Sequence, residues 1–157
     1  MIEYLVMDVD GTLTDGKIYM SNNGELMKAF NIKDGAGIHD ILIPAGITPV
    51  IITGRTSDIV LNRCKELGIT EVHQGVSNKI EKLITIISGE DKLNTVAYIG
   101  DDINDFSCMK PIKDSGGIVG CPADAVDKVK QISDFISLKN GGDGAVREFI
   151  EWIINCV

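Results

Sequence analysis

Short apolar runs alternate along this chain with longer segments in which apolar residues recur at helical spacing. The runs predict strands at residues 2–9, 47–53, 71–75, 95–100, 117–121 and 134–137. After residue 53, Val60, Cys64 and Leu67 fall on one stripe that stops at Gly68, a natural end for a helix. Segments 78–89, 123–133 and 145–156 predict further helices. This alternation is typical of an α/β fold, a doubly wound parallel sheet with helices on both faces.

One stretch interrupts the alternation. Residues 17–20 and 25–30 flank the turn-rich tetrad Ser21-Asn22-Asn23-Gly24, which predicts a β-hairpin protruding between the first strand and the first helix. No repeat or linker divides the remaining sequence. We therefore expect a single domain over residues 1–157, with the hairpin as an insertion at about 17–30.

The amino-acid composition limits which classes of binding partner and which cellular location we expect. The chain is 44% hydrophobic and 24% charged, and its net charge of −8 comes without a basic patch, which argues against nucleic acid or an anionic membrane as a partner. No apolar run is long enough to span a bilayer, and the first residues lack the basic region of a secretory signal. The four cysteines form no Cys-x-x-Cys pair. We expect a cytoplasmic protein with reduced thiols.

Polar side chains follow four of the predicted strands, at the edge of the sheet where open α/β proteins bind ligands. In chain order they are Asp8 and Asp10; Thr53, Gly54 and Arg55; Lys79; and Asp101, Asp102, Asn104 and Asp105. Each group taken alone reads as an ordinary solvated turn, strand-end hydroxyl or helix start. Four such groups at successive strand ends favour a shared function.

The chemistry that these residues support is phosphoryl transfer. Asp8, Asp10 and Asp101 would repel one another unless a cation lay between them, and Mg²⁺ is the hard cation that prefers oxygen ligands. Thr53 and Lys79 offer a hydroxyl and an ammonium to a phosphate. A carboxylate beside a bound phosphoryl group can attack phosphorus and form an aspartyl-phosphate.

The set Asp8-x-Asp10-Gly-Thr, Thr53, Lys79 and Gly100-Asp101-Asp102-x-x-Asp105 resembles the motifs of the haloacid dehalogenase superfamily of phosphatases. Segments 14–16, 28–38, 52–55, 74–75, 98–102 and 141–148 further resemble its subclass of 3-deoxy-D-manno-octulosonate 8-phosphate (KDO 8-phosphate) phosphatases, over nearly the whole chain. The resemblance implies Mg²⁺-dependent hydrolysis of a phosphorylated sugar acid, with KDO 8-phosphate as the first expectation, through an aspartyl-phosphate.

The resemblance also implies roles for the acids. Asp8 would be the nucleophile, and Asp10 the general acid that protonates the leaving alcohol and then the base that activates water. Mg²⁺ would be held by the Asp8 and Asp101 carboxylates and by the Asp10 backbone carbonyl. Asp102 and Asp105 would support the site from behind, with Asp105 orienting Lys79.

The remaining roles concern the phosphate and the sugar. Thr53 and the Gly54 amide would hold phosphoryl oxygens, while Lys79 would neutralise charge on both the nucleophile and the phosphate. Asn104 would line the site. Arg55 matches a substrate carboxylate by its planar guanidinium, and the alternative is a plain surface arginine. An arginine here resembles the octulosonate enzymes, whereas a glutamate would resemble those for nine-carbon acids.

Two further expectations concern contacts between subunits: the role of Arg147 and the oligomeric state. Arg147 either enters a neighbouring subunit's site or caps the polar face of the last helix, and both stay open. About 43 residues separate Asp10 from Thr53, which leaves no room for the cap domain that most superfamily members insert. The resemblance implies a homotetramer in which hairpins form a central barrel and neighbours complete each site, because exposed hairpin edges invite pairing.

The sequence departs from the phosphatase subclass at two places, and three alternative functions remain beside hydrolysis of KDO 8-phosphate. Thr12 stands where the subclass commonly has valine, and the sequence stops soon after Trp152, without a long tail to reach a neighbour. The alternatives are a phosphatase for nine-carbon sialic-acid-type 9-phosphates, a receiver-like phosphoacceptor, and a regulatory domain without activity. Asp10 argues against the phosphoacceptor, because it has a task only where an alcohol leaves and water attacks, and the intact set of acids argues against the inactive domain.

Overall fold

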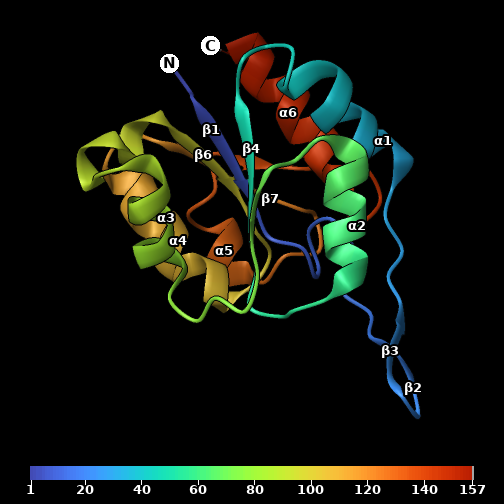
Figure 1. The fold of residues 1–157 in the computed structure, drawn as a ribbon. Coiled ribbons are helices and arrows are strands. Elements are labelled where there is room, and N and C mark those ends of the chain that lie inside the picture. Colours follow the sequence, from blue (N-terminus) through green and yellow to red (C-terminus); the bar gives the residue numbers. More distant parts are fainter. Residues whose placement is uncertain (157) are drawn as a thin grey trace.

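The computed structural model describes residues 1–156 and shows a parallel six-stranded sheet in the order β5-β4-β1-β6-β7-β8. Its strands are β1 (Tyr4–Met7), β4 (Thr48–Ile52), β5 (Glu71–His73), β6 (Val96–Ile99), β7 (Ile118–Cys121) and β8 (Phe135–Ile136). The sheet grows outward from β1 in both directions, so the strand order reverses at β1 and its neighbours (Figure 1). All six predicted strands are present, each shorter than its apolar run.

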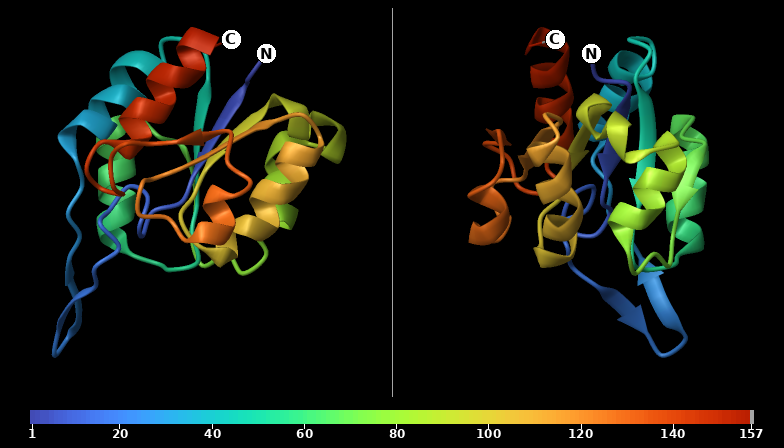
Figure 2. Two further views of the ribbon diagram at one scale, coloured as in Figure 1. Left: turned by 180° about the vertical axis from the view of Figure 1, so that it is seen from behind. Right: turned by 90° about the vertical axis from the view of Figure 1, so that its left-hand side faces the viewer.

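Helices cover both faces of this sheet (Figure 2). They are α1 (Ile32–Ala36), the π-helix η1 (Gly37–Leu42), α2 (Asp58–Leu67), α3 (Lys79–Ile87), the 3-10 helix η2 (Glu90–Thr95), α4 (Ile103–Asp114), α5 (Asp127–Lys130) and α6 (Ala145–Cys156). Strand residues alternate between two cores: Leu5 and Met7 pack with η1, α2 and α6, whereas Val6 packs with α3, α4 and α5. The predicted α/β class, doubly wound, is confirmed.

The segment 123–133 was predicted as one helix, and that prediction is wrong at both ends. Only Asp127–Lys130 is helical. The Val126 amide donates to the Asp101 carbonyl at 2.9 Å, and the Ala125 amide donates to the Pro122 carbonyl at 3.2 Å. These turn contacts hold residues 122–126 against the loop after β6, so the helix begins only at Asp127.

The predicted hairpin is present and projects away from the sheet (Figures 1 and 2). Strands β2 (Tyr19–Ser21) and β3 (Gly24–Met27) pair antiparallel, with Ser21 opposite Gly24 across the turn. Between Asp10 and β4 the chain forms this hairpin, α1 and η1, and no cap domain. The ligand-binding edge of the sheet is therefore left uncovered by any inserted domain within residues 1–156.

No helix among the described residues combines the length and the apolar character needed to cross a membrane.

Candidate active site

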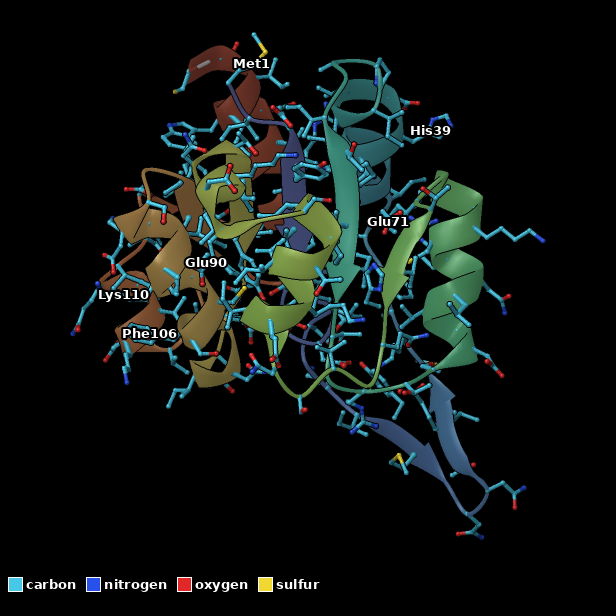
Figure 3. All side chains as sticks on the ribbon, turned by 60° about the vertical axis from the view of Figure 1, so that its left-hand side comes forward. Met1, His39, Glu71, Glu90, Phe106 and Lys110 are labelled. Atoms are coloured by element: carbon cyan, nitrogen blue, oxygen red, sulfur yellow. The ribbon has the colours of Figure 1, made fainter. Side chains whose placement is uncertain are left out.

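A cleft of about 270 Å³ opens at the carboxyl ends of β1, β4 and β6. Its walls bring together residues from three of the four predicted strand ends: Asp8, Asp10, Gly16, Thr53, Gly54, Arg55, Asp101, Asp102 and Asn104. The exposed His39 belongs to η1 and lies away from the hairpin (Figure 3), and neither it nor His73 lines the cleft. The titratable side chains that could transfer a proton in this cleft are therefore its carboxyl groups.

Lys79 lies beneath the cleft, at the start of α3. Its Nζ is 2.9 Å from Asp8 Oδ1 and 2.7 Å from Asp105 Oδ1, and its side chain is 2% exposed. Burial alone would lower the pKa of Lys79, but the two facing carboxylates raise it above its ordinary value. Lys79 is thus held as a cation against Asp8.

Asp105 is the structural centre behind the site. Its Oδ1 accepts hydrogen bonds from Lys79 Nζ and from the Tyr98 hydroxyl, each at 2.7 Å, and its Oδ2 accepts the amides of Asp101 at 3.0 Å and Asp102 at 3.2 Å. Oxygens of Asp8, Asp101 and Asp105 lie within 4.8 Å of one another, as a metal cluster would require. Because four donors already occupy both oxygens of Asp105, Asp8 and Asp101 are the two acids of this cluster that can offer a carboxylate oxygen to a cation.

The Asp8 and Asp101 carboxylates are buried beside a further carboxylate, which disfavours their charged forms. Burial, aided by repulsion from Asp105, raises the pKa of Asp8 to about 6 against the opposing effect of Lys79. Burial with repulsion from Asp105 and Asp8 raises the pKa of Asp101 to about 7. The Thr12 hydroxyl donates to Asp101 Oδ1 at 3.1 Å, which gives this residue a polar role that a valine would lack. A divalent cation between the two acids would favour their charged forms.

Two glycines allow the close approaches that shape the cleft. Gly11 has a φ of +89°, and a Cβ at this position would collide with the Asp101 carboxylate. A Cβ on Gly141 would collide with the Gly11 carbonyl oxygen, and the Gly142 amide donates to the Thr12 carbonyl at 3.1 Å. The loop before α6 therefore braces the loop after β1, although the two are far apart in the sequence.

Lys28 is a site neighbour to which the sequence assigned no role. Its Nζ lies 2.5 Å from Asp10 Oδ1 and 2.8 Å from Glu25 Oε1. Burial would lower the pKa of Lys28, but hydrogen bonds to these two carboxylates raise it above its ordinary value. The only sequence signal was its place in a segment resembling the phosphatase subclass, because Lys28 is 18 positions from Asp10 in a hairpin that reads as exposed.

The two arginines that we expected to bind substrate lie in different places. Arg55 is half-exposed on the cleft, with Nε 4.0 Å from Asp10 Oδ2 and a terminal nitrogen 3.9 Å from Glu25 Oε1. Arg147 lies on α6 beside a separate pocket, where its Nε donates to Glu151 at 2.6 Å. The structure does not bring Arg147 into the cleft of its own chain.

Comparison with known proteins shows close relatives. No family model matches the chain. The 3-deoxy-D-manno-octulosonate 8-phosphate phosphatase KdsC of Escherichia coli K12 is 41% identical over 157 residues, which cover 98% of this chain and 79% of KdsC. The crystal structure of the Yersinia pestis phosphatase of the same name superposes with a TM-score of 0.85 at 39% identity, covering 98% of this chain and 81% of that one.

A second solved structure carries ligands. The Moraxella catarrhalis KDO 8-phosphate phosphatase, in complex with a magnesium ion, a phosphate ion and KDO, has a TM-score of 0.86 at 38% identity, covering 98% of this chain and 86% of that one. A Legionella pneumophila structure described as a putative haloacid dehalogenase superfamily hydrolase superposes with a TM-score of 0.85 at 35% identity, over 98% of this chain and 82% of that one. The fold, the cleft and these relatives agree: the chain belongs to the KDO 8-phosphate phosphatase family of the haloacid dehalogenase superfamily.

Proposed function

We propose that this protein hydrolyses KDO 8-phosphate in a Mg²⁺-dependent reaction in which Asp8 is the nucleophile. The observation that carries the proposal is the pairing of Asp8 with the buried Lys79, beside Asp10 and Asp101 in one cleft. The family relationship supports the same chemistry, because relatives with 41% and 38% identity are phosphatases of this sugar acid.

In the first half-reaction, an oxygen of Asp8 forms a bond to phosphorus while the bond from phosphorus to the substrate alcohol oxygen breaks. The protonated Asp10 carboxyl gives its proton to that leaving oxygen, which therefore departs as a neutral hydroxyl group of the sugar acid. Lys79, 2.9 Å from Asp8, stabilises the negative charge at the nucleophile and on the phosphoryl group. Thr53 and the Gly54 amide, on the cleft wall, are the donors for the phosphoryl oxygens.

In the second half-reaction, the Asp10 carboxylate takes a proton from water as the water oxygen bonds to phosphorus. The bond between phosphorus and Asp8 breaks, which restores the Asp8 carboxylate and releases inorganic phosphate. Asp10 is left protonated for the next turnover. The two steps need the same carboxyl group in opposite protonation states, which a single acid two positions after the nucleophile provides.

The donor set fits Mg²⁺. Asp8 and Asp101 offer carboxylate oxygens within 4.8 Å of one another, and burial followed by repulsion from neighbouring carboxylates raises the pKa of both acids, so a cation would stabilise their ionised forms. The Asp10 backbone carbonyl is the third expected ligand. When bound, Mg²⁺ supplies positive charge to the phosphoryl oxygens as negative charge builds up on them.

Specificity for the sugar acid is assigned to Arg55 and Asn104. Both line the cleft, and the half-exposed Arg55 guanidinium has no partner closer than 3.9 Å among the described acids. It is therefore available to a substrate carboxylate. The nine-carbon 9-phosphates are the competing substrates, and arginine rather than glutamate at this position favours the octulosonate.

The test compares phosphate release from KDO 8-phosphate with release from a nine-carbon sugar-acid 9-phosphate, each with Mg²⁺ and with EDTA. We expect faster Mg²⁺-dependent turnover of KDO 8-phosphate and a loss of at least about 1,000-fold in Asp8→Asn. Asp114→Asn, at the exposed end of α4, is the matched control and retains activity. Full activity in Asp8→Asn would refute the nucleophile assignment, and absence of turnover would favour a regulatory or phosphoacceptor role.

Other expectations stay predictions. These are a single domain over residues 1–157, a homotetramer built on the hairpins, a cytoplasmic location and entry of Arg147 into a neighbour's site. The exposed apolar side chains of the hairpin, Ile18, Met20, Leu26 and Met27, support the assembly, because burying them against other copies would remove apolar surface from water. Size-exclusion chromatography with light scattering tests the tetramer.

A further inference from the structure

A chain of short polar contacts ties the β3 side of the hairpin to the active site. The Ser57 hydroxyl, at the start of α2, donates to Glu25 Oε2 at 2.5 Å. Glu25 Oε1 accepts from Lys28 Nζ at 2.8 Å, and Lys28 Nζ donates to Asp10 Oδ1 at 2.5 Å. The contacts thus run from a helix of the core, through the hairpin, to the carboxyl group assigned to proton transfer.

The burial of Lys28 shows that this contact is built into the fold. The Lys28 side chain is 3% exposed, whereas that of Asp10 is 20% exposed and faces the cleft. Removing an ammonium from water is unfavourable unless carboxylates compensate it, and two carboxylates do so here. Glu25 also restricts the long lysine side chain to one position, since it is itself fixed by Ser57.

The two oxygens of Asp10 have different hydrogen-bond partners. Oδ1 accepts a hydrogen bond from Lys28 Nζ at 2.5 Å, whereas Oδ2 accepts none from the described residues and lies 4.0 Å from Arg55 Nε. Proton transfer to a leaving group requires the donor oxygen to lie within hydrogen-bond distance of it in a fixed orientation. A carboxyl group anchored through one oxygen presents the other in a defined direction.

We propose that Lys28 is a positioning residue: it anchors Asp10 through Oδ1, so that Oδ2 delivers its proton to the leaving oxygen, with Glu25 holding Lys28 in place. The proposal rests on the proposed role of Asp10 as general acid. As the phosphorus–oxygen bond breaks, the proton on Oδ2 moves to the alcohol oxygen and Asp10 becomes a carboxylate. Lys28 keeps all its protons and stabilises the charge that appears on Asp10.

The leaving group provides a test that a merely structural role would not pass. The parameter kcat/KM reports the steps up to the first irreversible one, departure of the leaving group. An alkyl phosphate such as KDO 8-phosphate needs a proton for this departure, whereas p-nitrophenyl phosphate releases a stable anion and does not. We expect Lys28→Met to lower kcat/KM for KDO 8-phosphate by about 10- to 100-fold, and for p-nitrophenyl phosphate by less than about threefold.

Three further variants complete the experiment. Lys28→Arg keeps the positive charge and should recover most of the lost activity, and Glu25→Gln should show a weaker loss with the same substrate preference. Lys17→Met, an exposed lysine at the other side of the hairpin, is the matched control and leaves both rates unchanged. A cooperative thermal melting transition shows that each variant is folded. If Lys28→Met does not fold, the same comparison of the two substrates is made with Glu25→Gln.

The outcomes separate this proposal from the proposed function. Equal losses on both esters in Lys28→Met, with Asp10→Asn selective for the alkyl ester, would overturn the role of Lys28 and leave that of Asp10 intact. Unchanged rates in Lys28→Met would also overturn it. If Asp10→Asn itself shows no leaving-group selectivity, the general-acid assignment fails and the positioning role fails with it.

Discussion

Replacing Asp105 by asparagine would break the buried network behind the nucleophile. The Asp105 side chain is fully buried and accepts hydrogen bonds from Lys79, Tyr98 and the amides of Asp101 and Asp102. An asparagine keeps one acceptor oxygen, so its amide group faces donors and leaves at least two of them without a partner. Removing one member of a buried ion pair costs about 3–5 kcal/mol of the free energy of unfolding.

Urea denaturation in EDTA measures this cost. With a slope on the order of 2 kcal/mol per M, the expected loss lowers the midpoint by roughly 2 M. Tyr98→Phe removes a single hydrogen bond to the same carboxylate and should cost about 1 kcal/mol. Asp114→Asn, whose ion pair with Lys110 is exposed, should cost less than about 1 kcal/mol. Similar midpoints for Asp105→Asn and Asp114→Asn would refute the network's importance.

Three more predictions concern pH, metal and substrate. Burial raises the pKa of Asp34 to about 6, so its ionisation destabilises the fold as pH rises from about 4 to 6. Over this window the free energy of unfolding of Asp34→Asn, measured in urea, should rise by about 3 kcal/mol relative to wild type. A difference between the two proteins that stays constant with pH would contradict this. Mg²⁺ should raise the melting temperature at pH 8 but not at pH 5, because Asp8 and Asp101, with pKa values of about 6 and about 7, are protonated at pH 5. Equal Mg²⁺-induced shifts of the melting temperature at the two pH values would exclude these acids as ligands. Arg55→Met should raise the KM for KDO 8-phosphate about 10- to 100-fold. The KM for p-nitrophenyl phosphate, which lacks a carboxylate, should change by no more than about twofold. Equal effects on both KM values would show that Arg55 does not bind the carboxylate.

The parallel sheet was predictable from the sequence because its strands are buried on both faces and read as continuous apolar runs. Val96–Ile99 is an example, with all of its residues buried. The short α5 was not predictable, because its start depends on the Val126 amide meeting the Asp101 carbonyl, a contact between distant segments. Helical periodicity reports which side chains could share a face, not which backbone groups are already bonded elsewhere.

The candidate site was predictable where residues follow strands, since parallel strands bring their carboxyl ends to one edge. Asp8, Thr53 and Asp101 are of this kind, and the cleft contains all three. Lys28 was not, because no periodicity relates a hairpin residue to the loop after β1. Its contact with Asp10 depends on the angle at which the hairpin leaves the sheet, which only the three-dimensional structure gives.

We propose that Asp8 accepts the phosphoryl group beside a Mg²⁺ ion held by Asp8 and Asp101. A crystal structure of this protein with Mg²⁺ and tetrafluoroaluminate would test this proposal. We expect the ion between these two carboxylates and the Asp10 carbonyl, with aluminium in line with an Asp8 oxygen and Lys79 close to the fluorides. An ion or a phosphate mimic bound elsewhere, or a mimic out of line with Asp8, would contradict it.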